Sequence, residues 1–137
     1  MLRNILFALL ALALFIVCVM LGDGASASLF PPTPGLDFTN ADALRAYMES
    51  VPTSCFVVML LGHALGSVLA GFIVARFTRD KEGRPGSVAT AFIVCALITF
   101  AGVMNLVRIP HPTWFWSDVL TYPIFMLIGY LAGRRKQ

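Results

Sequence analysis

The chain has 137 residues, of which 58% are hydrophobic and only 12% are charged, with a net charge of +3. A soluble domain carries about 25% charged and about 45–50% apolar residues, so this composition leaves too little polar surface to face water on all sides. The basic excess lies in short clusters between apolar runs, which is typical of a membrane-orientation signal and not of a nucleic-acid binder.

The first apolar run covers about 5–22 and follows a short basic start that contains Arg3. The run is longer than the core of a signal peptide, which is usually about 7–15 residues, although Ala25-Ser26-Ala27 offers a cleavage site. We interpret the run as a transmembrane anchor, and cleavage near residue 27 is the alternative.

A polar stretch, 23–52, separates the first apolar run from the second and contains a proline-rich part that must be extended or turn. The 40–50 segment predicts a short helix with Thr39 or Asn40 as its N-cap. Three of its apolar side chains fall on one face at helical spacing: Leu44, Tyr47 and Met48. We therefore expect this helix to lie on the outer face of a bundle or on the membrane surface.

Three further apolar runs cover about 53–76, 87–107 and 113–133. Each has about the 20 residues that a helix needs to cross a bilayer, and isolated spans must satisfy their own backbone groups as helices. The sequence predicts an all-α fold: a single domain, 1–137, that forms a bundle of four transmembrane helices with a short helix in the first outer loop.

The basic residues predict the orientation. Eight of the ten Lys and Arg residues lie at the N-terminus, in the 76–86 loop or in the tail, and only Arg45 and Arg108 lie on the other side. The positive-inside rule then places both termini in the cytoplasm, and for a bacterial source the protein would lie in the inner (cytoplasmic) membrane. Trp114 and Trp116 fall at the outer interface, as an aromatic belt does.

Small residues recur at four-residue spacing, the pattern that lets helix backbones approach closely in lipid. The predicted packing positions are Gly62, Gly66, Ala70, Gly102, Gly129 and Gly133. They favour packing within the chain, with homo-oligomerisation as the alternative.

Five polar residues stand out by their depth from the outer edge: His63, Asn105, Arg108, Asp118 and Tyr122. Buried ionisable groups in a membrane are unfavourable unless they find partners, so we expect one polar pocket in the outer half of the bundle. In this pocket Arg108 would pair with Asp118, and His63 would bond Tyr122 or Asn105. The same residues also fit a purely structural role, in which they hold helices together.

No motif in the sequence carries known chemistry. The three cysteines form no CxxC pair and no metal-ligand spacing, and no phosphate loop, nucleophile elbow or carboxylate pair occurs. We expect a protein that is not an enzyme and that has no metal site and no cofactor.

The segments His63-Ala64-Leu65-Gly66, 101–105 and Pro112-Thr113-Trp114-Phe115 resemble those of a group of small bacterial four-helix membrane proteins. Members share an H-A-L-G segment, a G-G-x-x-N segment and a P-x-W-F entry to the last helix, and Ala101 here replaces the first glycine of the second motif. The resemblance covers nearly the whole chain. It implies the four-helix architecture, and because the group has no assigned activity it implies no function.

Two functional hypotheses follow. The first is an accessory or assembly subunit of a membrane complex, which the small-residue surfaces and the lack of catalytic residues favour. The alternative is a small transporter or ligand-binding bundle that uses the outer-half polar pocket. The partners expected are the lipid bilayer and either a membrane protein or a second copy, with no nucleic acid.

Overall fold

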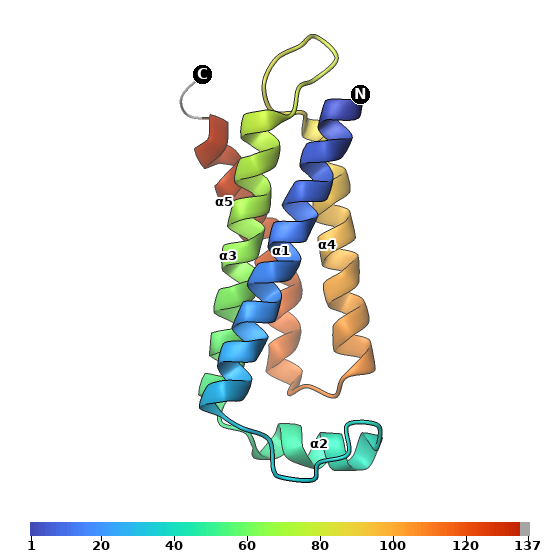
Figure 1. Cartoon of the computed structure of the whole chain (residues 1–137), viewed down its shortest axis with the longest axis vertical. Helices are drawn as coiled ribbons and strands as arrows, with labels where there is room; N and C mark the ends of the chain where they lie inside the picture. Colours follow the sequence, from blue (N-terminus) through green and yellow to red (C-terminus); the bar gives the residue numbers. More distant parts are fainter. Residues whose placement is uncertain (135–137) are drawn as a thin grey trace.

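The computed structural model describes residues 1–134 and confirms an all-α bundle, with no strand in that range (Figure 1). Its elements are α1 (Leu2–Leu29), α2 (Ala41–Ser50), α3 (Thr53–Phe77), α4 (Val88–Arg108), a 3-10 turn η1 (Thr113–Ser117) and α5 (Asp118–Arg134). Four segments are long and apolar enough to cross a membrane, namely α1, α3, α4 and η1 together with α5. Two basic residues of the predicted cytoplasmic tail, Arg135 and Lys136, lie outside the described residues.

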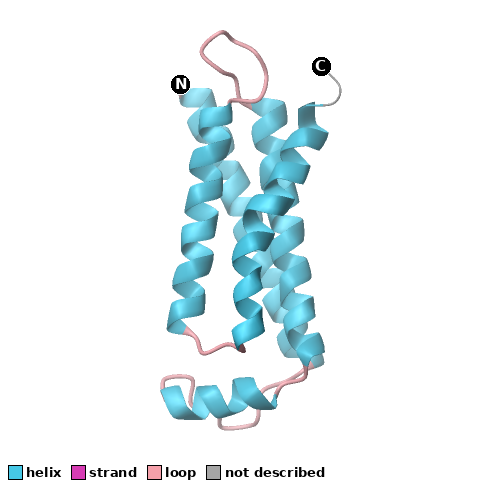
Figure 2. Ribbon diagram, turned by 180° about the vertical axis from the view of Figure 1, so that it is seen from behind, coloured by secondary structure: helices cyan, strands magenta, loops and turns pink. Residues whose placement is uncertain are grey.

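The chain start, the 78–87 loop and the end of α5 lie at one end of the bundle, and α2 lies with the 109–112 link at the other (Figure 1). We call the α2 end the outer end, after the orientation that the basic residues predict. Seen from behind, α2 runs across this end of the bundle (Figure 2).

Helix α1 is longer than predicted. The sequence suggests that the first span ends near residue 22, but α1 continues to Leu29 because its polar last turns pack against α3. Ser26 is buried, and its hydroxyl donates a hydrogen bond to the carbonyl of Cys55 at 2.9 Å. This bond satisfies a polar side chain that sequence reasoning assigned to the loop.

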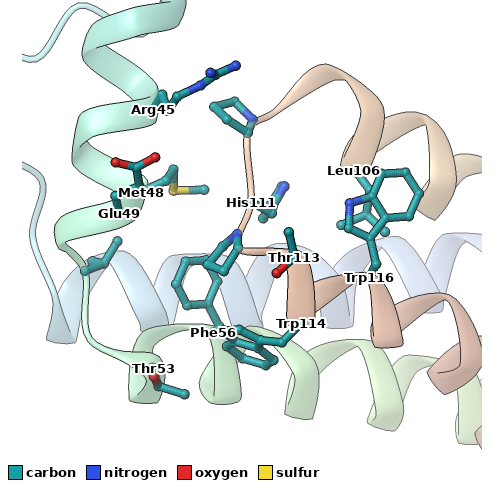
Figure 3. Close-up of a pocket in the computed structure, with 13 residues that line it drawn as sticks. Arg45, Met48, Glu49, Thr53, Phe56, Leu106, His111, Thr113, Trp114 and Trp116 are labelled. Carbon is teal, nitrogen blue, oxygen red and sulfur yellow. The ribbon is translucent and has the colours of Figure 1, made fainter.

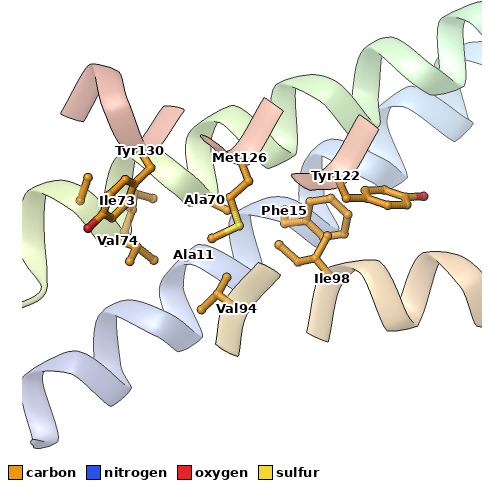
Figure 4. Packing of buried hydrophobic residues seen from close by; sticks show 11 residues of the cluster. Ala11, Phe15, Ala70, Ile73, Val74, Val94, Ile98, Tyr122, Met126 and Tyr130 are labelled. Atoms are coloured by element: carbon orange, nitrogen blue, oxygen red, sulfur yellow. The ribbon is translucent and has the colours of Figure 1, made fainter. Parts of the chain in front are cut away.

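Helix α3 is the centre of the bundle and makes its main contacts with α1 on one side and α5 on the other. Helix α4 lies at the periphery, chiefly against α5. The core between these helices is apolar and contains Phe15, Ala70, Ile98 and Met126 (Figure 4).

The predicted small residues allow these contacts. Gly62 faces Gly22 so closely that a Cβ on Gly62 would lie 2.8 Å from the Cα of Gly22. On the other side of α3, a Cβ on Gly71 would collide with the carbonyl of Met126, and one on Gly129 with the carbonyl of Val68. An added Cβ would also be too close to a neighbour at the other predicted glycines: at Gly66 to Phe15 and Cys18, at Gly102 to the Tyr122 ring, and at Gly133 to Phe72 and Ala75. Helix backbones therefore approach each other within the chain at Gly62, Gly71, Gly129 and Gly133, as small-xxx-small patterns allow.

Helix α2 begins with Asn40 as its N-cap, since the Asn40 side chain accepts hydrogen bonds from the backbone N–H groups of Asp42 and Ala43. The three apolar residues predicted on its inner face are half-buried, and Met48 packs on a small outer cluster formed by Phe56, Leu106 and Phe115. No residue of α2 is fully buried, so this helix packs on the surface of the bundle and does not contribute to its core.

Candidate functional site

Three of the five predicted polar residues meet in the outer half of the bundle. The Nδ1 atom of His63, on α3, lies 2.7 Å from Oδ2 of Asp118, on α5. The hydroxyl of Tyr122 donates to the same oxygen at 2.5 Å and lies 3.3 Å from His63 Nδ1. All three are buried: His63 is 3%, Asp118 1% and Tyr122 3% exposed. We call these three residues the buried triad.

The start of α5 stabilises the Asp118 carboxylate. Asp118 follows the η1 turn and is the first residue of α5, at the positive end of the helix dipole. Tyr122 follows one turn later on the same face, which explains its hydrogen bond to Asp118. The acid is therefore placed where a helix favours an anion.

Tyr122 is fixed by the other two helices. Its ring lies against Gly102 of α4, where any Cβ would overlap the ring, and edge-on to Phe15 of α1 at a centroid distance of 5.9 Å. Glycine at 102 thus makes room for the aromatic ring. All four long helices contribute to the surroundings of the buried triad.

The hydrogen bonds assign the tautomer of His63. When Asp118 is ionised, its carboxylate can only accept, so Oδ2 accepts hydrogen bonds both from the Tyr122 hydroxyl and from the Nδ1–H of His63. In the neutral ring, Nε2 is then the free basic nitrogen. Nε2 lies 3.9 Å from Oδ1 of Asp23, on α1.

Sequence reasoning missed Asp23. It treated the residue as part of the outer loop, whereas α1 continues past it and the Gly22–Gly62 contact brings Asp23 alongside His63. The sequence feature that could have indicated it is Asp23 itself, a single acidic residue that directly follows Gly22 at the end of the first apolar run. Its side chain is 44% exposed, so Asp23 joins the buried triad to the surface.

Two carboxylate oxygens in the described range have no hydrogen-bond partner although they are buried: Asp23 Oδ1 and Asp118 Oδ1. Such groups are rare in folded proteins and indicate a water, an ion or a proton that satisfies them. The buried triad together with Asp23 is therefore a polar site with unused acceptors.

Asn105 and Arg108 do not join the site, which contradicts the predicted pocket. The buried stripe of α4 runs through Val94, Ile98, Gly102 and Leu106. Asn105 lies next to this stripe and is exposed. Arg108 is exposed at the last residue of α4, where its charge suits the negative end of the helix dipole, and it makes no ion pair with Asp118.

The second histidine, His111, lies in the outer link. Its ring stacks on Phe115 at 5.0 Å, and its Nδ1 contacts the carbonyl of Ile109 at 2.7 Å. Burial lowers the pKa of His111, so the ring favours its neutral form. The charges of Asp118 and Asp23 act on it in the opposite sense.

Within residues 1–134 no group of three or more His, Cys, Asp or Glu side chains is arranged to hold a metal ion. Comparisons of the chain with models of protein families, with characterised proteins and with solved structures gave no match.

Proposed function

We propose that this chain is a small ligand-binding bundle of the bacterial inner membrane, and that its ligand in the outer half is a proton. The observation that carries the proposal is the setting of His63. One ring nitrogen is held by Asp118, and the other faces Asp23 without a direct hydrogen bond. Ionisable residues inside a membrane bundle mark proton and substrate sites.

The geometry provides a position for a proton at Nε2. A proton there turns His63 into an imidazolium between two carboxylates, Asp118 at 2.7 Å and Asp23 at 3.9 Å. The attraction of the two carboxylates for the charged ring would have to offset the cost of placing a charge at a buried position. Histidine is the side chain whose ordinary pKa allows this change near neutral pH.

Asp23 connects the site to the outer end. Asp23 is half-exposed there, whereas the inner side of Tyr122 is the apolar core of Phe15, Ala70 and Met126 (Figure 4). Protons would enter through Asp23. Pro123 follows Tyr122 inside α5 and leaves the carbonyl of Val119 without a helical donor, which gives α5 a point at which to bend.

The second candidate, an accessory subunit of a membrane complex, rests on a different observation. An apolar groove of about 440 Å³ lies beside α4 and α5 and is lined by Phe92, Cys95, Phe100 and Pro123. The small-residue surfaces that first suggested a partner are occupied within the chain itself. In this second candidate function, a helix of the partner protein would pack into the groove.

Nuclear magnetic resonance of ¹⁵N-histidine-labelled protein tests the proton site. The chain has only two histidines, so His111→Asn assigns the signals. We expect His63 to carry its proton on Nδ1 at high pH and to gain one at Nε2 on acidification. We also expect Asp118→Asn to mix the two neutral tautomers and Asp23→Asn to slow proton exchange between the ring and outer water.

Asp37→Asn is the matched control, because Asp37 is another acid at the outer end and bonds only within its own turn, to Thr39. This variant should leave the His63 signals unchanged. A His63 ring that gains no proton at Nε2 at any pH at which the protein stays folded would rule out the proton site.

Reporter fusions test the proposed orientation. A fusion at residue 35, in the loop before α2, should report the outer compartment, and a fusion at residue 82, in the loop between α3 and α4, should report the cytoplasm. An outside signal at 82 would mean that Asp23 opens to the cytoplasm and that the inner and outer ends are exchanged.

A further inference from the structure

A second polar cavity lies at the outer end, apart from the buried triad. Its volume is about 610 Å³, and it lies between α2 and the link that leads to α5 (Figure 3). The residues that matter for its chemistry are Arg45, Glu49, Phe56, His111, Trp114 and Trp116. We call it the outer chamber.

The α2 wall of the chamber carries one charge of each sign. Arg45 and Glu49 are four residues apart and share one face of α2. Both are exposed, and in the described part of the chain neither forms an ion pair. A cation and an anion that line the same cavity, each without an ion-pair partner in the described part of the chain, complement a ligand that itself carries one negative and one positive group.

The opposite wall is aromatic. Phe56 lies edge-on to Trp114 at 5.7 Å and near Phe115 at 5.2 Å, and His111 completes this surface. Trp114 and Trp116 are 41% and 45% exposed, so part of each indole remains open to a ligand. Indole rings attract ammonium groups through cation–π contacts and also prefer the headgroup level of a bilayer.

The depth of the chamber fits a lipid. It lies where η1 starts the last membrane-crossing segment, and its other wall is an amphipathic helix that runs across the end of the bundle. Both features are typical of the membrane–water interface. A headgroup in the chamber would leave its acyl chains free to run along the apolar helix surfaces.

We propose that the outer chamber binds the headgroup of a zwitterionic phospholipid, with the phosphate on Arg45 and the ammonium group between Glu49 and the Trp114 indole. Guanidinium groups bind phosphate strongly, and a carboxylate accepts hydrogen bonds from an ammonium group. This site is separate from the buried triad, so its test does not depend on proton binding at His63.

Tryptophan fluorescence reads this site directly, because the chain has two tryptophans and both line the chamber. Short-chain phosphatidylethanolamine is titrated into the full protein in a non-ionic detergent at neutral pH. We expect a saturable change in emission. Short-chain phosphatidylglycerol, which has the phosphate and the chains but no ammonium group, should give a much weaker response.

Arg45→Gln and Glu49→Gln should each weaken binding by about tenfold, which corresponds to one lost charge-assisted hydrogen bond. Arg108→Gln is the matched control, since Arg108 is an exposed arginine at the same end that does not line the chamber. An equal response to phosphatidylglycerol, or normal binding by Glu49→Gln, would overturn the zwitterion assignment. Equal binding of phosphoethanolamine without acyl chains would overturn the lipid assignment.

Discussion

Replacing Gly71 with alanine is expected to destabilise the bundle by about 1–3 kcal/mol, the range for overpacking a close contact. The added methyl group would overlap the backbone carbonyl of Met126, on α5. A backbone atom cannot rotate aside as a side chain can, so α3 and α5 must separate. Because α3 makes one of its two main contacts with α5, the loss should appear as a lower midpoint of thermal unfolding in detergent.

Gly24→Ala is the matched control. Gly24 also lies inside a long helix, α1, but a Cβ there meets nothing within 4 Å. Alanine should stabilise this position by about 0.5–1 kcal/mol through its better helix propensity. If both variants lose stability equally, the Gly71 contact is not the tight approach that the structure describes.

The fold could be predicted because lipid imposes simple rules. Runs of about 20 apolar residues must be helices, and short loops leave few ways to connect them. The end of α1 was predicted wrongly, since its last turns are polar by composition. Ser26 and Asp23 remain helical because α3 lies beside them, and that neighbour cannot be read from local sequence.

The site was predictable in part, and for the same reason. His63, Asp118 and Tyr122 are at matching depths in long helices, so depth alone brings them together. Asn105 and Arg108 are also at a suitable depth, but α4 turns its Leu106 face inward and both residues point away from the site. Depth follows from counting residues, whereas the rotation of a helix depends on its packing.

Replacing His63 with alanine is the strongest test of the buried triad. The Asp118 carboxylate would lose the contact at 2.7 Å and keep only the hydroxyl of Tyr122. Removing a hydrogen-bond donor from a buried carboxylate costs about 1.5–3 kcal/mol, because the acceptor stays buried without that partner. We expect a large fall in the thermal unfolding midpoint of the purified protein at neutral pH.

The double variant His63→Ala with Asp118→Asn shows whether this loss comes from charge. Asparagine is close in size to aspartate, and its carbonyl oxygen can still accept the Tyr122 hydroxyl, so packing is nearly unchanged while the buried charge is removed. If Asp118 is ionised beside His63, the double variant should be more stable than His63→Ala alone, and a double-mutant cycle should give a clear interaction energy. Losses that simply add would mean that the two residues contribute separately, by packing alone. In that case the triad would not be a coupled unit, and the attraction that a proton at Nε2 requires would be absent.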